Sequence, residues 1–169
     1  MNIIHFKELS STNAYCKENL QTLNEFDVVC TDYQSGGYGQ WGRKWIDVGT
    51  DNIYMSIVLK PQRLREDIVR FTANCICEVL KRYGVVPEIK EPNDILVSGK
   101  KICGILAESV SYGEKIKGVV VGIGLNLNCE QKALESIDQP VTALSLEINR
   151  LIDKEKFIEE ILNKIEKSY

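Results

Sequence analysis

Histidine is almost absent from this 169-residue chain, which contains His5 and no other. A single histidine excludes a histidine-rich metal site and argues against a catalytic serine–histidine–aspartate or cysteine–histidine group. Any chemistry must therefore use lysine, arginine, carboxylates, backbone amides or a bound cofactor.

The chain also lacks a Cys-x-x-Cys pair and a long apolar run. Its cysteines stand at positions 16, 30, 75, 77, 103 and 129, which favours reduced, mostly buried thiols over a zinc site or a disulfide framework. The first eleven residues include Lys7 and Glu8 and match neither a secretory signal nor a membrane-spanning helix. These features predict a cytoplasmic protein without a membrane partner.

The chain also lacks a large net charge, because its 21 basic residues nearly balance its 24 acidic ones and the formal net charge is -3. Nucleic-acid binding usually needs a basic face, so no nucleic-acid partner is expected. The length fits one domain, and we expect residues 1–169 to form a single domain.

Apolar runs rich in β-branched residues predict strands at 27–31, 53–59, 102–106 and 118–123.

Helical spacing predicts a helix over 67–83, stopped by Gly84, with one side formed by Ile68, Phe71, Cys75, Val79 and Arg82. A second helix is predicted over 154–167, capped by Asp153, with Phe157, Ile161, Leu162 and Ile165 facing inward. A third is predicted over 13–20, after Ser11 or Thr12. The order indicates an α+β domain built on a mostly antiparallel sheet.

Residues 34–45, here called the glycine loop, hold four glycines within seven consecutive positions. Glycine has no Cβ and tolerates positive φ, so such a loop can bring backbone amides close to an anion. Arg43 and Lys44 supply charge for phosphate, and Trp41 and Trp45 can stack on a flat ring or pack over the loop. Taken alone, the segment is equally typical of a flexible surface loop.

A Pro-Asn-Asp turn at 92–94 and a Gly-Lys-Lys turn at 99–101 predict a β-hairpin. Lys101 then enters a buried strand, which makes it a candidate functional cation, although a solvated turn lysine is the commoner fate. Asp94 could coordinate magnesium or orient a phosphate-bound water, and its alternative role is an Asx turn.

Two glycines and two asparagines end the apolar strand at 122–128. Glycine at such a place indicates close approach of backbone or ligand. Asn126 could read the edge of a base, because its amide both donates and accepts hydrogen bonds.

Together with Ser11-Thr12-Asn13, these segments resemble the biotin protein ligase family. That family's core has a Ser-Thr-Asn entry, a Gln-x-x-Gly-Arg-Gly-Arg-x-Gly-Arg-x-Trp loop, a Lys-Trp-Pro-Asn-Asp turn, a Lys-x-x-Gly-Ile-Leu strand and a Gly-Ile-Gly-x-Asn-x-Asn strand end. All five segments occur here in order, between Ser11 and Asn128.

The resemblance implies the fold shared by biotin and lipoate ligases and class II aminoacyl-tRNA synthetases, a curved antiparallel sheet flanked by helices. It also implies an enzyme that uses ATP and Mg²⁺ to convert biotin to biotinyl-5′-AMP. The biotin would then pass to a specific lysine of a biotin carrier protein, such as the carrier subunit of acetyl-CoA carboxylase. Cations, amides and magnesium suit this chemistry, because it mainly brings two anions together and needs no enzyme nucleophile.

The matching positions assign roles by resemblance. The catalytic residues would be Lys101 and Arg43. Biotin would be bound by Ser11, Thr12, Asn13, Gln34, Gly37, Tyr38, Gly39, Lys101 and Gly104. ATP and the adenylate would be bound by Gln40, Trp41, Arg43, Trp45, Asn93, Asp94 and Asn126, with Asp94 also meeting magnesium through the nucleotide's phosphates.

The chain departs from the family pattern at Tyr38 and Gln40, which replace two arginines of the loop, and at Glu91, which replaces tryptophan. The neutral Gln40 would hold the loop less firmly, so release of free adenylate is part of the expectation. Neither the helix-turn-helix nor the C-terminal β-barrel domain found in family members is expected here.

Two other functions stay open on the sequence. The lost arginines could mark a degenerate, non-catalytic biotin-binding module. A lipoate ligase-like enzyme would share the fold and the lysine, but such relatives typically carry a histidine after the loop. A homodimer is also left open.

Overall fold

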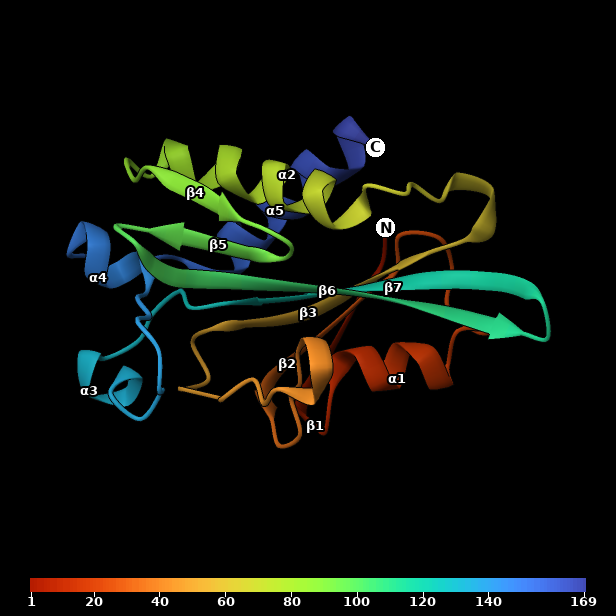
Figure 1. Cartoon of the computed structure of the whole chain (residues 1–169), viewed down its shortest axis with the longest axis horizontal. Coiled ribbons are helices and arrows are strands. Elements are labelled where there is room, and N and C mark those ends of the chain that lie inside the picture. Colours follow the sequence, from red (N-terminus) through yellow and green to blue (C-terminus); the bar gives the residue numbers. More distant parts are fainter.

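The computed structural model describes the backbone of residues 1–169 and all side chains except that of Arg63. Seven strands form one sheet in the order β1-β2-β3-β7-β6-β5-β4 (Figure 1). The strands are β1 (Ile3–Leu9), β2 (Val28–Gln34), β3 (Ile53–Leu59), β4 (Pro87–Lys90), β5 (Asp94–Val97), β6 (Lys100–Tyr112) and β7 (Lys115–Leu125). β1 runs parallel to β2 and the other neighbouring pairs are antiparallel, which confirms the mostly antiparallel sheet.

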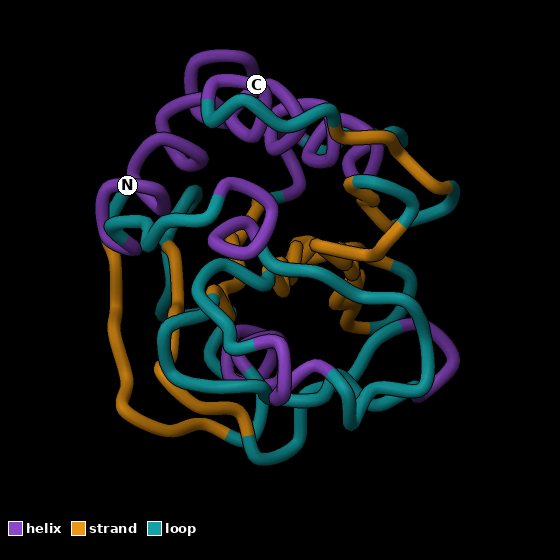
Figure 2. Tube along the Cα trace, turned by 90° about the vertical axis from the view of Figure 1, so that its left-hand side faces the viewer, coloured by secondary structure: helices purple, strands orange, loops and turns teal.

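Helices pack on both faces of the sheet. α2 (Ile68–Arg82) and α5 (Lys154–Ser168) cover one face and α1 (Thr12–Glu18) lies on the other (Figure 1). Figure 2 shows this layering from the side, with the helices near the C-terminus above the strands and many of the loops below them. The short elements are α3 (Gln131–Leu134), α4 (Leu144–Ile148) and the 3₁₀ turns η1 (Gln40–Gly42) and η2 (Pro61–Arg63). Among the described residues, no helix has the length and apolar character needed to cross a bilayer.

All seven residues of the central strand β3 are buried, as expected when helices cover both faces of the sheet. Successive side chains of a strand point to opposite faces. Alternate residues join the large apolar cluster beneath α2 and α5, namely Ile53, Met55, Ile57 and Leu59. Val58 joins the smaller cluster beneath α1, so Ser56 points to the α1 face as well. That face carries the candidate site.

The long helices agree closely with the sequence prediction. α2 is flanked by Asp67 and Tyr83, and Gly84 follows with φ +90°, as expected of a helix stop. Asp153 caps α5 by accepting a 3.0 Å hydrogen bond from the Lys156 amide, and the four residues predicted to face inward are buried. Of the five residues predicted on one side of α2, Arg82 is exposed while the other four are buried, because its charged head at the last turn stays in water.

Several boundaries differ from the prediction. α1 begins at Thr12 and ends at Glu18, with Ser11 Oγ accepting from the Ala14 amide at 3.3 Å. β1 and β4 were not predicted; both lie at the edges of the sheet and are only partly buried. β6 and β7 extend well past the predicted runs, because their paired outer ends are mostly exposed and carry little apolar signal.

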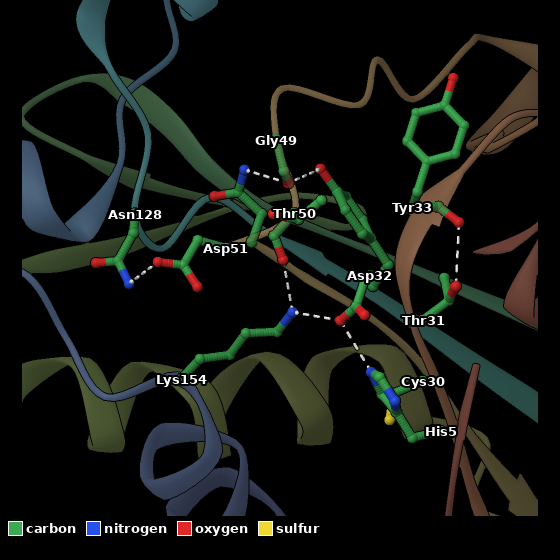
Figure 3. A network of polar contacts seen from close by, with 12 residues as sticks. His5, Cys30, Thr31, Asp32, Tyr33, Gly49, Thr50, Asp51, Asn128 and Lys154 are labelled. Carbon is green, nitrogen blue, oxygen red and sulfur yellow. Dashed lines mark hydrogen bonds and ion pairs between the residues drawn. The ribbon is translucent and has the colours of Figure 1, made fainter. Parts of the chain in front are cut away.

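A polar network fixes the start of α5 to the sheet (Figure 3). Lys154 Nζ lies 2.7 Å from the Thr50 carbonyl oxygen and 3.4 Å from Asp32 Oδ1. His5 Nε2 lies 2.9 Å from the same Asp32 oxygen. Partial burial alone would raise the pKa of Asp32, but His5 and Lys154 outweigh it and hold that pKa below its usual value.

We expect Asp32→Asn to lower the free energy of unfolding at neutral pH, and the difference from the parent to shrink in acid. A depressed folded-state pKa gives stability that is complete above the unfolded value of about 3.9 and is lost as the pH falls through the folded value. Urea unfolding of both proteins, from neutral pH down to about pH 3, measures this difference. A difference that stays constant over the whole range would contradict the network's contribution.

Candidate active site

A cavity of about 370 Å³ lies between the start of α1, the glycine loop and strands β5 to β7. The predicted site residues come from segments spread over more than a hundred positions, and the fold brings them together here. Those that line the cavity are Ser11, Thr12, Asn13, Gln34, Tyr38, Gly39, Gln40, Trp41, Arg43, Trp45, Asn93, Asp94, Lys101, Gly104 and Asn126. Their individual roles toward a ligand stay predictions.

Gly37 is the predicted site residue that lies outside the described lining. It is buried at the base of the glycine loop, where its carbonyl accepts a 3.0 Å hydrogen bond from the Trp45 amide. A Cβ at this position would lie 2.9 Å from Gln34 Nε2. Glycine therefore lets the base of the loop pack closely against Gln34.

The turn before Lys101 sets the position of this residue. Ser98 and Gly99 both have positive φ, 53° and 73°, as in the type I′ turns that join two strands tightly. The Lys101 backbone is held on its other side too, because its amide donates to the Pro140 carbonyl and its carbonyl accepts from the Thr142 amide, both at 2.9 Å. The backbone of Lys101, and with it the start of the side chain, is thus fixed by hydrogen bonds to Pro140 and Thr142.

The Lys101 ammonium group is held at the cavity by an acid and an aromatic ring. Its Nζ lies 2.8 Å from Asp94 Oδ1 and 5.2 Å from the centre of the Trp45 ring. The Lys101 and Asp94 side chains are only 17% and 21% exposed, so this charge pair is poorly screened by water. Such a cation is well placed to meet an anionic ligand.

Glycines on two adjacent strands form a flat floor under Trp45. Gly104 of β6 pairs directly with Gly124 of β7. A Cβ would lie 2.6 Å from Trp45 Cε2 if added at Gly124, and 2.8 Å from Trp45 Cζ3 if added at Gly104. The indole can rest on the sheet only because both side chains are missing. Its Nε1–H is buried and has no hydrogen-bond partner among the described residues, which leaves one donor unused.

We expect Gly124→Ala to displace the Trp45 indole, because the added methyl group would overlap it. Overpacking of this kind usually costs about 1–3 kcal/mol in the free energy of unfolding. Near-ultraviolet circular dichroism and tryptophan fluorescence report the displacement. Gly39→Ala is the matched control, since its Cβ would meet its nearest neighbour, the Arg43 carbonyl oxygen, at an ordinary 3.8 Å. A parent-like near-ultraviolet spectrum for Gly124→Ala would contradict this packing.

The far end of the cavity is polar. The Ser56 hydroxyl lies 2.6 Å from Asn13 Oδ1 and 2.7 Å from Thr12 Oγ1. Because a hydroxyl has one hydrogen and an amide oxygen only accepts, Ser56 donates to Asn13. The Thr12 amide donates to Gln34 Oε1 at 2.8 Å, which joins the start of α1 to the end of β2. A Cβ at Gly122 would overlap the Asn13 side chain, so glycine makes room for it.

The glycine loop folds back on itself as a small hairpin. Tyr38 pairs with Lys44, and the Gly39 amide donates to the Arg43 carbonyl at 2.7 Å. Trp41 stands at the tip with φ 61° and a side chain that is 90% exposed. Arg43 is exposed at the same tip. The loop therefore presents a cation and an aromatic ring at the mouth of the cavity.

The two asparagines predicted to bind ATP, Asn93 and Asn126, also join backbone segments. Asn93 Nδ2 donates to the Ile105 carbonyl at 3.1 Å, and the Ile105 amide donates to the Asn93 carbonyl at 2.9 Å. Asn126 Nδ2 donates to the Thr142 carbonyl at 3.0 Å. Both side chains are thus oriented by the fold before any ligand binds.

Part of the cavity wall carries no signal in the sequence. Ile137, Gln139 and Val141 line it after β7, in a stretch without any motif. Ser56 was not predicted either, although a lone hydroxyl inside the apolar run of β3 is a signal for a buried hydrogen bond.

All six cysteines are buried, free thiols, as the sequence predicted. Burial raises the pKa of Cys16 to about 12, and the pKa values of Cys77 and Cys129 to about 11. These groups are therefore protonated at neutral pH and poor nucleophiles.

Comparison with known proteins places the chain in a family. The model of the biotin/lipoate A/B protein ligase family matches residues 5–126, which is well over half of the chain. The chain belongs to this family. The matched residues, 5–126, include every segment that lines the cavity except the wall at 137–141.

Relatives and solved structures of this ligase family agree. The bifunctional ligase/repressor BirA of Bacillus subtilis is 31% identical over 175 residues, covering 99% of this chain and 54% of BirA. The biotin--[acetyl-CoA-carboxylase] ligase of Paracoccus denitrificans is 31% identical over 88% of this chain and 65% of that protein. The biotin protein ligase of Aquifex aeolicus, solved with biotin and ATP, has a TM-score of 0.85 at 26% identity, covering 98% of this chain and 69% of that one. The fold is that of the biotin ligase catalytic region, and the chain spans about half the length of BirA.

Proposed function

We propose that this chain converts biotin and ATP to biotinyl-5′-AMP and transfers the biotin to a lysine of a carrier protein, such as the carrier subunit of acetyl-CoA carboxylase. The observation that carries the proposal is the convergence of five distant segments on one cavity beside the Lys101 ammonium group. The names of the relatives support it, since they are biotin ligases and one of the similar structures holds biotin and ATP.

In the first step, an oxygen of the biotin carboxylate attacks the α-phosphorus of ATP and pyrophosphate leaves. Both reactants are anions, so the main task of the protein is to hold them together and neutralise charge. Lys101 would contact the carboxylate and the α-phosphate, with Asp94 orienting its ammonium group at 2.8 Å. Arg43 at the loop tip would meet the remaining phosphates.

In the second step, the amine of the carrier lysine attacks the carbonyl carbon of the mixed anhydride. AMP leaves and the amine loses its proton to solvent. None of the protein's own side chains needs to act as a nucleophile, which fits a site built from lysine, arginine, amides and hydroxyls. The need for ATP is compatible with the cytoplasmic location that we propose.

Magnesium fits the site only together with the nucleotide. Asp94 offers one carboxylate beside Lys101, and no group of three His, Cys, Asp or Glu side chains suited to a metal occurs in the described part of the chain. Mg²⁺ usually binds through one or two carboxylates plus substrate phosphates, so Asp94 is a suitable single ligand. Bound there, the ion would neutralise charge on the leaving pyrophosphate.

Thermal unfolding with ligands tests the proposal. We expect biotin and MgATP together to raise Tm by far more than the sum of their separate shifts, because the adenylate combines both sets of contacts in the folded state. The control is a nucleotide with a methylene bridge between its α- and β-phosphates, which cannot release pyrophosphate and should give additive shifts. Additive shifts with ATP itself would point instead to a biotin-binding module without catalysis.

A further inference from the structure

Glu108 of β6 connects three elements around the polar end of the cavity, although it lies outside the cavity's described lining. Its Oε1 accepts a 2.6 Å hydrogen bond from Lys17 Nζ. Its Oε2 accepts from Asn13 Nδ2 at 2.8 Å and from the Tyr38 hydroxyl at 2.9 Å. One carboxylate thus joins the sheet to α1 and to the glycine loop.

The protonation states of this cluster favour those hydrogen bonds. Burial alone would raise the pKa of Glu108, but the hydrogen bonds from Lys17, Asn13 and Tyr38 outweigh it and hold that pKa below its usual value. Burial, together with the bond to Glu108, raises the pKa of Tyr38. At neutral pH the carboxylate is therefore ionised and the phenol keeps the hydrogen that it donates, which gives a charge-assisted bond.

Asn13 is held rigidly by the same carboxylate. One amide hydrogen goes to Glu108 and the other to the Leu106 carbonyl at 3.3 Å. Its Oδ1 accepts from Ser56 at 2.6 Å. With both donors in use, the Asn13 side chain shapes the polar end of the cavity in one fixed orientation.

We infer that Glu108 is a positioning residue, which holds the glycine loop against the sheet through Tyr38 and so keeps the loop over the biotin end of the cavity. Backbone hydrogen bonds within the loop fold its hairpin, but they do not fix the hairpin relative to β6. Trp45 packs the C-terminal end of the loop on Gly104 of β6, and the bond from Tyr38 to Glu108 ties the other strand of the hairpin to β6, with Lys17 balancing the charge that makes this bond strong. The hydrogen bond between Tyr38 and Glu108 anchors the loop in the ligand-free chain. The effect of this anchor on biotin binding rests on the proposed function.

Limited trypsin digestion of the ligand-free protein tests the anchor. Arg43 and Lys44 are exposed cleavage sites within the loop. We expect Tyr38→Phe and Glu108→Gln each to speed cleavage after these residues by about tenfold, the effect of losing a charge-assisted hydrogen bond. Tyr38→Phe removes this bond and Glu108→Gln removes the charge that strengthens it, so both changes act on one contact and the double variant should be cleaved no faster than the faster single variant.

Glu78→Gln is the matched control, because it also removes a carboxylate paired with a lysine, Lys164, but on α2. Cleavage of this variant should match the parent. If Glu108→Gln does not fold, Tyr38→Phe still carries the test, since phenylalanine keeps the ring and loses only the hydroxyl. Parent-like cleavage of a folded Tyr38→Phe, or effects that multiply in the double variant, would overturn the inference.

A kinetic measurement separates positioning from general structure. Both single variants should raise KM for biotin and the dissociation rate of the adenylate by about tenfold, and leave kcat for adenylation at saturating biotin within a few-fold of the parent. A fall in kcat without a change in KM would overturn the positioning role. If the parent itself forms no adenylate, the proposed function fails while the digestion result still decides the anchor.

Discussion

Replacing Lys101 by alanine is expected to lower the rate of adenylate formation by about 10²–10³-fold, the usual effect of removing one charge that stabilises a transition state in a poorly solvated site. The ammonium group is only partly exposed and is held by Asp94 at 2.8 Å, and a water in its place would carry no positive charge. Pyrophosphate release at saturating biotin and ATP measures the rate. Far-ultraviolet circular dichroism should stay native, because Lys101 is not part of the apolar core.

Further variants make this prediction specific. Lys100→Ala removes the adjacent, exposed lysine and should keep the parent rate. The double variant Lys101→Ala/Asp94→Asn removes the carboxylate charge left without its partner. Its comparison with Asp94→Asn alone, which lacks the same proposed magnesium ligand, separates lost attraction from added repulsion of the substrates. Activity of Lys101→Ala within a few-fold of the parent would reject the assignment and make Lys100 the next candidate.

Gln40→Arg is expected to slow the escape of the adenylate by about ten- to a hundredfold. Gln40 lines the cavity within the glycine loop, and its backbone carbonyl accepts from the Arg43 amide at 3.2 Å. Arginine would add a full charge and a rigid fork of donors, and a charge-assisted hydrogen bond to the adenylate is worth about 1.5–3 kcal/mol. The parent should therefore release reactive biotinyl adenylate and label nearby lysines indiscriminately.

Labelling of a bystander such as serum albumin, together with the dissociation rate of preformed adenylate, measures this leak. Gln40→Met is the matched control, because methionine has a similar length and no charge, and it should behave like the parent. Tyr38 and Trp41 line the cavity too and could retain the ligand by packing over it. If the arginine variant labels the bystander as much as the parent and holds the adenylate no longer, Gln40 is not the weak point of the loop.

The parts of the fold that depend on local rules could be predicted from the sequence. Asp153 and Gly84 mark helix ends through capping and positive φ, which need only neighbouring residues. The Gly-Lys-Lys sequence at 99–101 likewise predicted Lys101 near the start of a strand, and the turn itself lies at Ser98 and Gly99 with β6 beginning at Lys100. Glycine, asparagine or lysine at unusual places drew attention to three of the segments that line the cavity, but their common role followed from the resemblance of five motifs to the biotin protein ligase family.

The contacts between distant segments could not be predicted in this way. Glu108 meets Lys17 and Tyr38 across 91 and 70 residues, and no local pattern indicates such pairs. The wall at 137–141 is positioned by backbone bonds to Lys101, which leave no mark on its own sequence. The edge strand β1 is half exposed, so its apolar pattern is weak.

The intact mass of a biotin carrier domain, measured after incubation with this protein, biotin, ATP and magnesium, tests the central claim most directly. The account predicts an increase of one biotin on the acceptor, lost when ATP is omitted, when Lys101 is replaced by alanine, or when the acceptor lysine is replaced by arginine. An unchanged carrier mass, with the protein binding biotin equally well in the presence and absence of ATP, would contradict it.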